Sequence, residues 1–297
     1  MSVLLIFIDG LGIGRRDAAN PFYELAEAAL PLAVFQDAEP DLPFEGLLIR
    51  TDARLGIEGR PQSASGQTTI LTGVNVPFLL GYHKQGFPNA AMREILSEHS
   101  IFLQLEELGI EPNVFANAYT PQFFEEAPRW KSATTCAVEA SNMRFRTLDD
   151  LREGKAVFHD FTNYAARERG FDIALRSPEE AAKILAGLAS EHCFTLYEHF
   201  ITDKIGHEQN FERARKHLPE LARFVRAVLE TSDLTKITVL ITSDHGNIED
   251  LSVRNHTLND VPTLVWGSEK EFFADKIKSL ADVTPAIIEI LKNRKNN

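Results

Sequence analysis

Short apolar runs alternate along the chain with segments of helical periodicity, and this alternation constrains the fold more than any other feature. We expect strands at 3–8, 114–118, 193–201, 237–241 and 261–266. We expect helices at 67–72, 92–108, 178–190, 208–231 and 284–291. Strands that alternate with helices pair in parallel and are covered on both faces. The sequence therefore predicts an α/β fold, a mostly parallel sheet sandwiched by helices.

The stretch 120–172 interrupts this alternation. It is rich in aromatic residues and holds eight Lys or Arg residues against nine acidic ones. We expect it to form a small cap inserted over the functional site, between the two parts of the core, 1–119 and 173–297. The alternative is that 120–172 is an irregular part of the same domain.

The composition argues against some classes of partner. The formal net charge of −12 disfavours binding to nucleic acid or to an anionic membrane.

The two cysteines, Cys136 and Cys193, cannot form a disulfide framework, which favours a cytoplasmic protein. The apolar run 3–8 ends at Asp9 without a basic region before it, so we expect a strand rather than a signal peptide. No stretch approaches the ~20 apolar residues that a membrane span needs.

Acidic and imidazole side chains follow the predicted strands near the point where each strand ends. Asp244 and His245 come after the run 237–241, and Asp9 comes directly after the run 3–8. The carboxyl ends of parallel strands meet at one edge of the sheet, where open α/β folds place their chemistry. A lone Asp at such a position is also a common turn former.

A second set of the same ligand types lies at the same predicted edge. Asp203 and His207 follow the run 193–201, and His256 precedes the run 261–266. The spacing of Asp203 and His207 lets both face one ion if the segment is helical, although a solvated surface pair has the same spacing. Together the clusters predict a binuclear metal site, and their His and Asp side chains suit Zn²⁺ or Mn²⁺.

The segment 61–69 supplies hydroxyl groups immediately before a predicted helix. They belong to Ser63, Ser65, Thr68 and Thr69. Backbone N–H groups at a helix N-terminus favour a phosphate or an oxyanion. Ser and Thr at such positions also simply cap helices, so the residues alone leave the choice of nucleophile open.

In their order along the chain, these motifs resemble those of the alkaline phosphatase superfamily. The nearest branch is that of cofactor-independent phosphoglycerate mutase and phosphopentomutase. The resemblance covers about 1–118 and 173–293. It is carried by Asp9-Gly-Leu-Gly, the Ser63 segment ending in Leu-Thr-Gly, Asp203-x-x-Gly-His207, Asp244-His245-Gly and His256-Thr.

The resemblance implies two divalent metal ions, Zn²⁺ or Mn²⁺, and a serine nucleophile. One ion would be held by Asp9, Ser63, Asp244 and His245, and the other by Asp203, His207 and His256. In the phosphatase and phosphodiesterase branches the nucleophile lies ten positions before the glycine of a Thr-Gly pair, and in the mutase branches three before a glycine. Counted from Gly73 and from Gly66, both rules select Ser63.

The chain departs from the mutase pattern in two respects. Gln67 occupies the position at which the mutase has a His. The mutase also carries a large second domain rich in basic substrate ligands, whereas this chain has only the stretch 120–172. The Cys-x-Pro-x-Arg motif of the sulfatases is absent from the sequence, which argues against a sulfatase.

Substrate contacts are expected among polar residues near the motifs and in the stretch 120–172. The candidates are Lys204, His83 and Lys84, with Arg144, Arg146, Thr162 and Asn163 of the stretch 120–172. Each of these residue types is also common on a solvated surface.

The sequence thus predicts a metal-dependent phosphotransfer enzyme that acts on a small-molecule phosphoester. Ser63 would attack phosphorus, and hydrolysis of the phosphoserine would release phosphate. The alternatives are a phosphomutase, which returns the phosphoryl group to another hydroxyl of the substrate, and a non-catalytic metal-binding relative. A mutase has to keep water away from its intermediate, and a lid of about 50 residues is small for that purpose.

Overall fold

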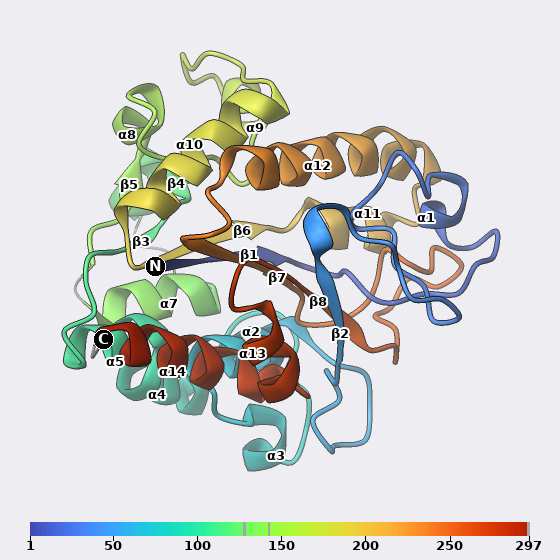
Figure 1. Ribbon diagram of the computed structural model, residues 1–297, viewed down its shortest axis with the longest axis horizontal. Coiled ribbons are helices and arrows are strands. Elements are labelled where there is room, and N and C mark those ends of the chain that lie inside the picture. Colours follow the sequence, from blue (N-terminus) through green and yellow to red (C-terminus); the bar gives the residue numbers. More distant parts are fainter. Residues whose placement is uncertain (127–128, 142, 296–297) are drawn as a thin grey trace.

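A six-stranded sheet forms the centre of the computed structural model, which describes residues 1–126, 129–141 and 143–295 (Figure 1). Its strands are β1 (Ser2–Ile8), β2 (Leu47–Thr51), β3 (Asn113–Phe115), β6 (Phe194–His199), β7 (Ile237–Thr242) and β8 (Val261–Trp266). They lie in the order β2-β8-β7-β1-β6-β3. The three strands that precede the acidic motifs, β6, β1 and β7, are therefore neighbours in the sheet.

The sheet is mostly parallel, as predicted. β1 pairs in parallel with β6 and β7, so that Ile6 lies opposite Tyr197 on one side and Ile241 on the other. β3 also pairs in parallel with β6, whereas β8 pairs antiparallel with β7 and β2. The chain returns from β7 to β8 through the helix-free loop 243–260 instead of a helical crossover, and it therefore runs in the opposite direction.

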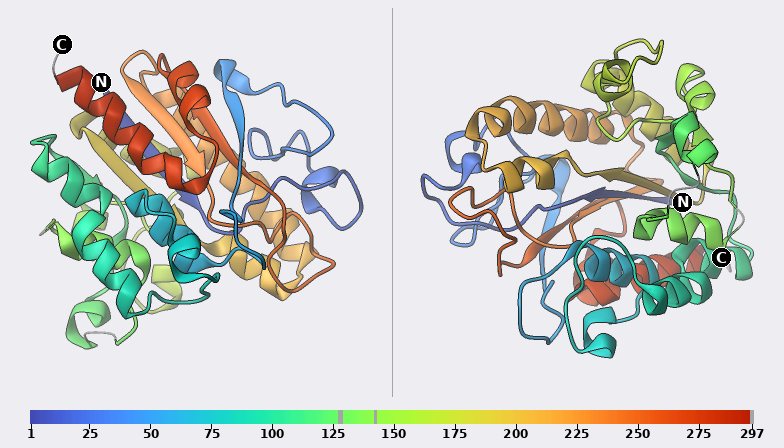
Figure 2. Two further views of the ribbon diagram at one scale, coloured as in Figure 1. Left: turned by 90° about the horizontal axis from the view of Figure 1, so that it is seen from below. Right: turned by 180° about the vertical axis from the view of Figure 1, so that it is seen from behind.

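Helices cover both faces of the sheet (Figures 1 and 2). One layer consists of α10 (Pro178–Glu191), α11 (Ile201–Glu208) and α12 (Phe211–Thr231), with the short α1 (Pro21–Glu24) against α12. The opposite layer consists of α2 (Ser63–Thr72), α3 (Val76–Leu80), α4 (Ala90–His99), α5 (Ile101–Glu107), α7 (Ala133–Ala140), α13 (Lys270–Lys276) and α14 (Val283–Lys295). Alternate residues of β1 enter the two cores: Leu4, Ile6 and Ile8 enter one, and Val3, Leu5 and Phe7 enter the other.

The helix predicted at 92–108 is in fact two helices, α4 and α5, with Ser100 between them. Ser100 has an extended backbone, and its hydroxyl accepts a hydrogen bond from the N–H of Leu103 as the N-cap of α5. The same hydroxyl donates to the carbonyl oxygen of Ala137 in α7. Apolar periodicity does not reveal such a break, because the residues on both sides of it stay buried.

Other predicted boundaries move by a few residues. The strand predicted at 193–201 ends at His199, because Ile201 begins α11. The helix predicted at 67–72 begins earlier, which makes Ser63 the first residue of α2. β2 lies outside all the predicted strands.

The stretch 120–172 has a small core of its own and also contributes to the main one. It contains α6 (Pro121–Glu126), α8 (Leu148–Arg152), α9 (Tyr164–Glu168) and the strand β5 (Arg146–Thr147), which pairs with β4 (Ala118–Tyr119). Leu148, Leu151, Phe158 and Ala166 are buried together in the small core. In contrast, α7 packs against α2 and α4 in the main helical layer. The division of the chain into a core and a separate cap stays a prediction.

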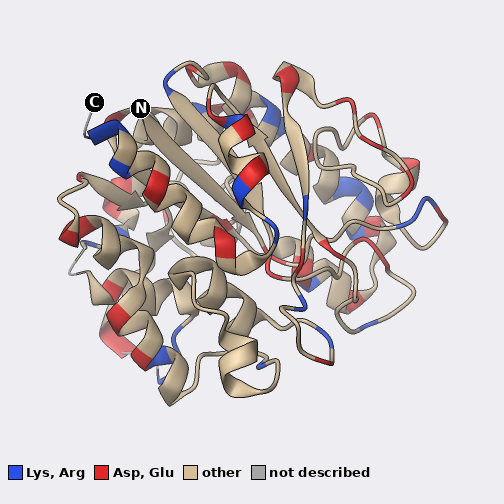
Figure 3. Ribbon diagram, turned by 60° about the horizontal axis from the view of Figure 1, so that its bottom comes forward, with Lys and Arg blue, Asp and Glu red and all other residues tan. Residues whose placement is uncertain are grey.

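Charged residues lie mainly on helices and loops, and the strands carry few of them (Figure 3). β1, β7 and β8 contain no charged residue, and β6 contains Glu198. A strand that is covered on both faces has few positions at which a charge can reach water. Among the helices of the described residues, none has the length and apolar character needed to cross a membrane.

A pair of histidines joins the end of β6 to α12. His199 Nε2 lies 2.9 Å from His217 Nε2, and the two rings are stacked. His199 Nδ1 lies 2.8 Å from the carbonyl oxygen of His159, so Nδ1 carries the hydrogen and Nε2 accepts one from His217. Burial lowers the pKa of His217 to about 4 and the pKa of His199 well below its ordinary value.

Acid is expected to destabilise the protein through this pair. The unfolded chain takes up a proton at His217 near the ordinary pKa of 6.5, but the folded chain does so only near pH 4. The contribution of neutral His217 to the free energy of unfolding is therefore fully present above about pH 6.5, and it is lost as the pH falls from about 6.5 to about 4. At pH 5 the loss from His217 is about 2 kcal/mol. In urea titrations at about pH 7.5 and pH 5, His217→Gln should lose less of its free energy of unfolding than the wild type. An equal loss in the wild type, His217→Gln and the exposed control His99→Ala would contradict the prediction.

Candidate metal centre

The ligand motifs meet at the carboxyl edge of the three central strands. Asp9 directly follows β1, α11 begins just after β6, and Asp244 lies shortly after β7. Since β6, β1 and β7 are adjacent and parallel, their ends reach the same place. The N–H of Asp9 donates to the carbonyl oxygen of His199, and the Thr202 hydroxyl donates to the carbonyl oxygen of Asp9. These bonds fix α11 against the end of β1.

Asp9, Asp244 and His245 form one group of ligand atoms, with the Ser63 hydroxyl beside it. His245 Nε2 lies 3.4 Å from Asp9 Oδ1 and 3.5 Å from Asp244 Oδ2. The same nitrogen lies 2.9 Å from Ser63 Oγ. All three members of the group are buried. The structure thus brings together the four residues predicted for the first ion.

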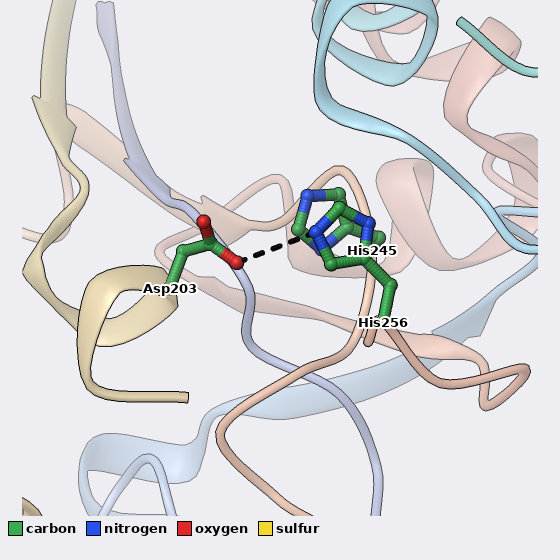
Figure 4. A group of neighbouring side chains, drawn as sticks. All are labelled: Asp203, His245 and His256. Atoms are coloured by element: carbon green, nitrogen blue, oxygen red, sulfur yellow. Dashed lines mark ion pairs between the residues drawn. The ribbon is translucent and has the colours of Figure 1, made fainter. Parts of the chain in front are cut away.

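Asp203, His207 and His256 form a second group next to the first. Asp203 Oδ2 lies 3.3 Å from His207 Nε2, and Asp203 Oδ1 lies 3.6 Å from His256 Nε2. Figure 4 shows the carboxylate of Asp203 directed at the paired rings of His245 and His256. The centroids of these two rings are 3.5 Å apart. The ligand atoms of Asp203, His245 and His256 are close enough together to hold an ion, so His245 lies between the two groups.

Backbone hydrogen bonds determine which nitrogen of His207 and of His256 can bind a cation. His207 Nδ1 lies 2.8 Å from the carbonyl oxygen of Arg254, and His256 Nδ1 lies 2.9 Å from that of Pro61. A carbonyl oxygen only accepts, so each Nδ1 carries a hydrogen, and in the neutral ring each Nε2 presents a lone pair. The two Nε2 atoms are 3.2 Å apart. Two lone pairs at this distance repel each other, and a cation between the rings would remove the repulsion.

The carboxylates also fit a site for cations. Burial, followed by the charges of Asp244 and Asp203, raises the pKa of Asp9 well above its ordinary value. Burial and the charge of Asp203 raise the pKa of Asp244 to about 7. Burial acts in the same direction on Asp203, but hydrogen bonds from His207 and Asn247 and the nearby His245 outweigh it and lower its pKa. Among the described residues, Asp9 Oδ1 is buried without a hydrogen-bond partner. Acidic groups in this state favour a bound cation.

Gln67 lies inside the centre, although the sequence marks it only as a departure from the mutase pattern. It is one turn along α2 from Ser63 and is buried. Its Nε2 lies 3.1 Å from Asp244 Oδ2 and 3.4 Å from Asp9 Oδ2. An amide donates to two carboxylates without adding a charge, so Gln67 positions these two ligands.

Two buried residues of the loop after β7 also position ligands, and sequence reasoning missed both. Asn247 Nδ2 donates to Asp203 Oδ1 at 2.6 Å. Gly206 makes room for this amide, because a Cβ atom there would lie 2.5 Å from Asn247 Cγ. Glu249 accepts hydrogen bonds from the backbone N–H groups of Gly12 and Asn247. The sequence signal for both residues is their place just after the Asp-His pair.

Two cavities open onto the centre. One, of about 600 Å³, has Ser63, Asp203, His207 and His256 in its wall. The other, of about 530 Å³, begins at Asp9, Ser63 and Asp203 and reaches residues of the stretch 120–172. The hydroxyl of Ser63 therefore stands where both cavities meet the ligands.

Of the residues predicted to contact substrate, Lys204 lies in the wall of the 530 Å³ cavity. Arg144 and Arg146 do not line either cavity. Arg144 makes two hydrogen bonds of 2.7 Å to Asp150, and Arg146 lies 3.5 Å from the same carboxylate. Both arginines are thus engaged at the start of α8, where Asp150 closes a capping box.

The remaining candidates also lie outside these two cavities, and three of them have hydrogen-bond partners elsewhere. Asn163 is fully buried and donates to the carbonyl oxygen of Ala174, and the Thr162 hydroxyl bonds to Asp160. The N–H of Lys84 donates to Ser65 Oγ at 3.0 Å. His83 precedes Lys84 in the same loop, and burial lowers its pKa. Within the described part of the chain, these four residues stay outside the walls of both cavities.

Comparison with known sequences finds relatives of part of the chain. Residues 174–295 match the model of the Metalloenzyme superfamily. The 2,3-bisphosphoglycerate-independent phosphoglycerate mutase of Ehrlichia ruminantium (strain Gardel) is 37% identical over 98 residues, which cover 30% of this chain and 19% of the mutase. The protein of the same name from Thermococcus kodakarensis is 26% identical over 136 residues, 42% of this chain and 32% of that protein. The chain thus matches less than a third of the length of these relatives.

Solved structures share the fold over nearly the whole chain. Alkaline phosphatase from the Antarctic bacterium TAB5 aligns with a TM-score of 0.51 at 12% identity and covers 98% of this chain and 97% of its own. A cold-active alkaline phosphatase from Shewanella sp. aligns with a TM-score of 0.52 at 10% identity, with 98% and 100% covered. At these identities the likeness shows the fold.

The fold of the chain is alkaline phosphatase-like, and its residues 174–295 resemble the Metalloenzyme superfamily. The resemblance to the alkaline phosphatase superfamily is thereby confirmed, and the matching sequences quoted above are cofactor-independent phosphoglycerate mutases.

Divalent ions are expected to stabilise the protein through these ligands. An ion that binds only the folded state raises Tm, by about 5 °C at a hundredfold excess over Kd. Chelator-treated protein should show this rise in differential scanning fluorimetry with MnCl₂ or ZnCl₂ near pH 8. Asp244→Asn and His256→Ala each remove a donor, so their rise should be smaller and their metal content below two equivalents. His99→Ala should behave as the wild type. A wild-type Tm that neither metal changes would contradict the prediction.

Proposed function

We propose that the protein is a binuclear metal-dependent phosphotransfer enzyme that acts on a small-molecule phosphoester. One observation carries the proposal: Ser63 Oγ lies 2.9 Å from His245 Nε2, among the ligands and in the wall of both cavities. A hydroxyl in this place is accessible to a substrate and adjacent to the ions that would activate it.

Seven side chains would hold the two ions. Asp9, Ser63, Asp244 and His245 would bind one, and Asp203, His207 and His256 the other. The facing Nε2 atoms of His207 and His256 support the second set, because both lone pairs point inward. Three carboxylates and a serine alkoxide would balance two dications, so that a phosphate meets little net repulsion. The ligands are carboxylates and imidazoles without a thiolate, which suits Zn²⁺ or Mn²⁺.

The chain's own residues supply the nucleophile and the binding site for the phosphate. When bound, the ions would lower the pKa of the Ser63 hydroxyl and neutralise charge on the phosphate oxygens. Ser63 Oγ then bonds to phosphorus while the bond to the leaving oxygen breaks, and a phosphoserine results. Ser63 begins α2, where the helix end adds partial positive charge. Lys204, in the cavity wall, would contact a phosphate oxygen.

The fate of the phosphoserine separates two reactions. Attack by water releases phosphate and restores Ser63, which defines a phosphatase. Transfer to another hydroxyl of the substrate defines a phosphomutase, and the names of the sequence relatives favour this outcome. The small separate core of the stretch 120–172 favours hydrolysis, because a mutase has to keep water from its intermediate. We therefore propose hydrolysis first and mutase activity as the second candidate.

We further propose a cytoplasmic protein whose partner is the small-molecule substrate rather than nucleic acid or a membrane. Cys136 and Cys193 are free thiols, which suits a reducing compartment. The net charge of −12 disfavours a polyanionic partner.

Ser63→Ala is expected to abolish turnover while metal binding persists. Loss of a covalent nucleophile lowers kcat by about a thousandfold or more. The measurement is phosphate release from 4-nitrophenyl phosphate by metal-loaded protein, together with metal content by mass spectrometry. Ser65→Ala is the matched control, because the Ser65 hydroxyl bonds to the backbone of Lys84 and not to a ligand. Full activity in Ser63→Ala would contradict the assignment of the nucleophile.

The products distinguish the two candidate reactions. With 3-phosphoglycerate or a pentose phosphate, the substrate types that a mutase would isomerise, ³¹P NMR should show that whatever phosphoester is consumed, even slowly, becomes inorganic phosphate. An isomerised phosphoester without free phosphate would instead establish the mutase. Both outcomes require Ser63, so the Ser63→Ala variant serves as the blank.

A further inference from the structure

We propose that the substrate carries an aromatic leaving group, which occupies the 530 Å³ cavity beside Ser63. This inference rests on the function proposed above, and it names the class of substrate for the same site.

Aromatic side chains form much of the wall of this cavity. It starts at Asp9, Ser63 and Asp203 and runs between the core and α6. Its wall includes the rings of Phe87, Phe115, Tyr119, Phe123, Phe158 and Phe200. These rings come from six different loops or elements, so they reach the cavity from separate parts of the chain.

Several of these rings contact neighbouring rings in edge, tilted or stacked arrangements. Tyr119 lies 4.4 Å from Phe123 and 6.1 Å from Phe115 between ring centroids. Phe87, at the surface, stacks on Trp130 at 6.4 Å. Aromatic walls of this kind bind a flat ring by apolar burial and by edge-to-face contacts.

Several polar groups near these rings already have partners, whereas the two ring nitrogens of His159, which also lines the cavity, are buried without one among the described residues. The Tyr119 hydroxyl and Ser132 Oγ both lie 2.9 Å from Thr135 Oγ1. Asn117 donates to the carbonyl oxygen of Glu198 and accepts from its N–H. A leaving group rich in hydroxyls would lose its hydrogen bonds to water here and gain few in return. The wall therefore favours a ring over a sugar or a glycerate.

Two basic residues of the wall suit the phosphate end of the substrate. Lys204 Nζ lies 4.7 Å from the centroid of Phe200, and Arg169 lines the same cavity. Neither forms an ion pair with an acidic side chain in the described part of the chain. Lys204 follows the candidate ligand Asp203 in α11, so in this proposal its charge serves the phosphate and the rings of the wall contact the leaving group.

The first test compares two substrates of equal intrinsic reactivity. 2-Phenylethyl phosphate and ethyl phosphate both release a primary alcohol, so that a difference in kcat/KM reports the contact with the ring. The metal-loaded wild type should prefer the phenylethyl ester at least tenfold. Equal kcat/KM values for the two esters would overturn the proposal.

Two neighbouring phenylalanines provide matched variants. Phe123 lines the cavity, whereas its neighbour Phe124 on α6 is exposed and does not. Phe123→Ala should reduce the preference for 2-phenylethyl phosphate at least fivefold, and Phe124→Ala should retain it. Phe87 lies at the rim of the cavity and is half-exposed, so Phe87→Ala should fold normally and should also reduce the preference for 2-phenylethyl phosphate. This second variant keeps the test valid if Phe123→Ala does not fold. A preference unchanged in both Phe87→Ala and Phe123→Ala would overturn the proposal.

Binding without turnover separates this inference from the proposed function. Calorimetry with the non-hydrolysable 2-phenylethylphosphonate and ethylphosphonate measures the effect of the ring directly on metal-loaded protein. If neither ester is hydrolysed but the phenylethyl compound binds at least tenfold more tightly, the aromatic site stands and the phosphatase function fails. Equal affinities would overturn the aromatic site whatever the turnover.

Discussion

The mutual repulsion of three carboxylates at one edge of the sheet is the constraint on which the rest of the site depends. Asp9, Asp203 and Asp244 approach one another in a largely buried place, and the pKa values of Asp9 and Asp244 are raised in consequence. Such an arrangement is costly for a stable fold unless cations compensate it. A cation would also relieve the repulsion between the facing nitrogens of His207 and His256. The rings of His245 and His256 are stacked beside them. A bound cation would offset the charge of the three carboxylates, which supports the proposed metal centre.

Rigid neighbours make this arrangement possible. The ligands follow three adjacent strands whose sides are buried, and their positions are secured by neutral donors and by one further acid. Gln67 donates to two carboxylates, Asn247 donates to the third, and Glu249 ties the loop after β7 to the glycine loop after β1. Polar groups around a ligand orient it without competing for the metal. These contacts explain why Ser63, at the start of α2, meets the ligands at a defined point.

Much of this could be predicted from the sequence, and the limits have physical reasons. The buried runs before Asp9 and Asp244 predicted the central parallel strands that the structure shows. The residues after these runs lie together as predicted, and their role as metal ligands stays a prediction. The break at Ser100 was not predicted, because apolar periodicity continues through it. The antiparallel direction of β8 was not predicted either, because the connection between two strands sets their relative direction and composition does not. The positioning roles of Asn247 and Glu249 were not predicted, because the sequence does not show whether an amide or an acid in a loop faces water or a metal ligand. The arginines of the stretch 120–172 were expected at the site, but Arg144 and Arg146 pair with Asp150 through local geometry that charge counts do not reveal.

The pairing of β1 with both β6 and β7 has a consequence for how the protein matures. Residues from the start of the chain are set beside residues some 190 to 235 positions later, so Asp9 meets its fellow ligands only after these distant strands have joined. Contacts of such separation are late and slow to form. Before these strands join, the pairs of candidate ligands that can already lie close together are those that are local in the sequence, Asp203–His207 and Asp244–His245. The complete set of candidate ligands therefore exists only in chains whose central sheet has closed.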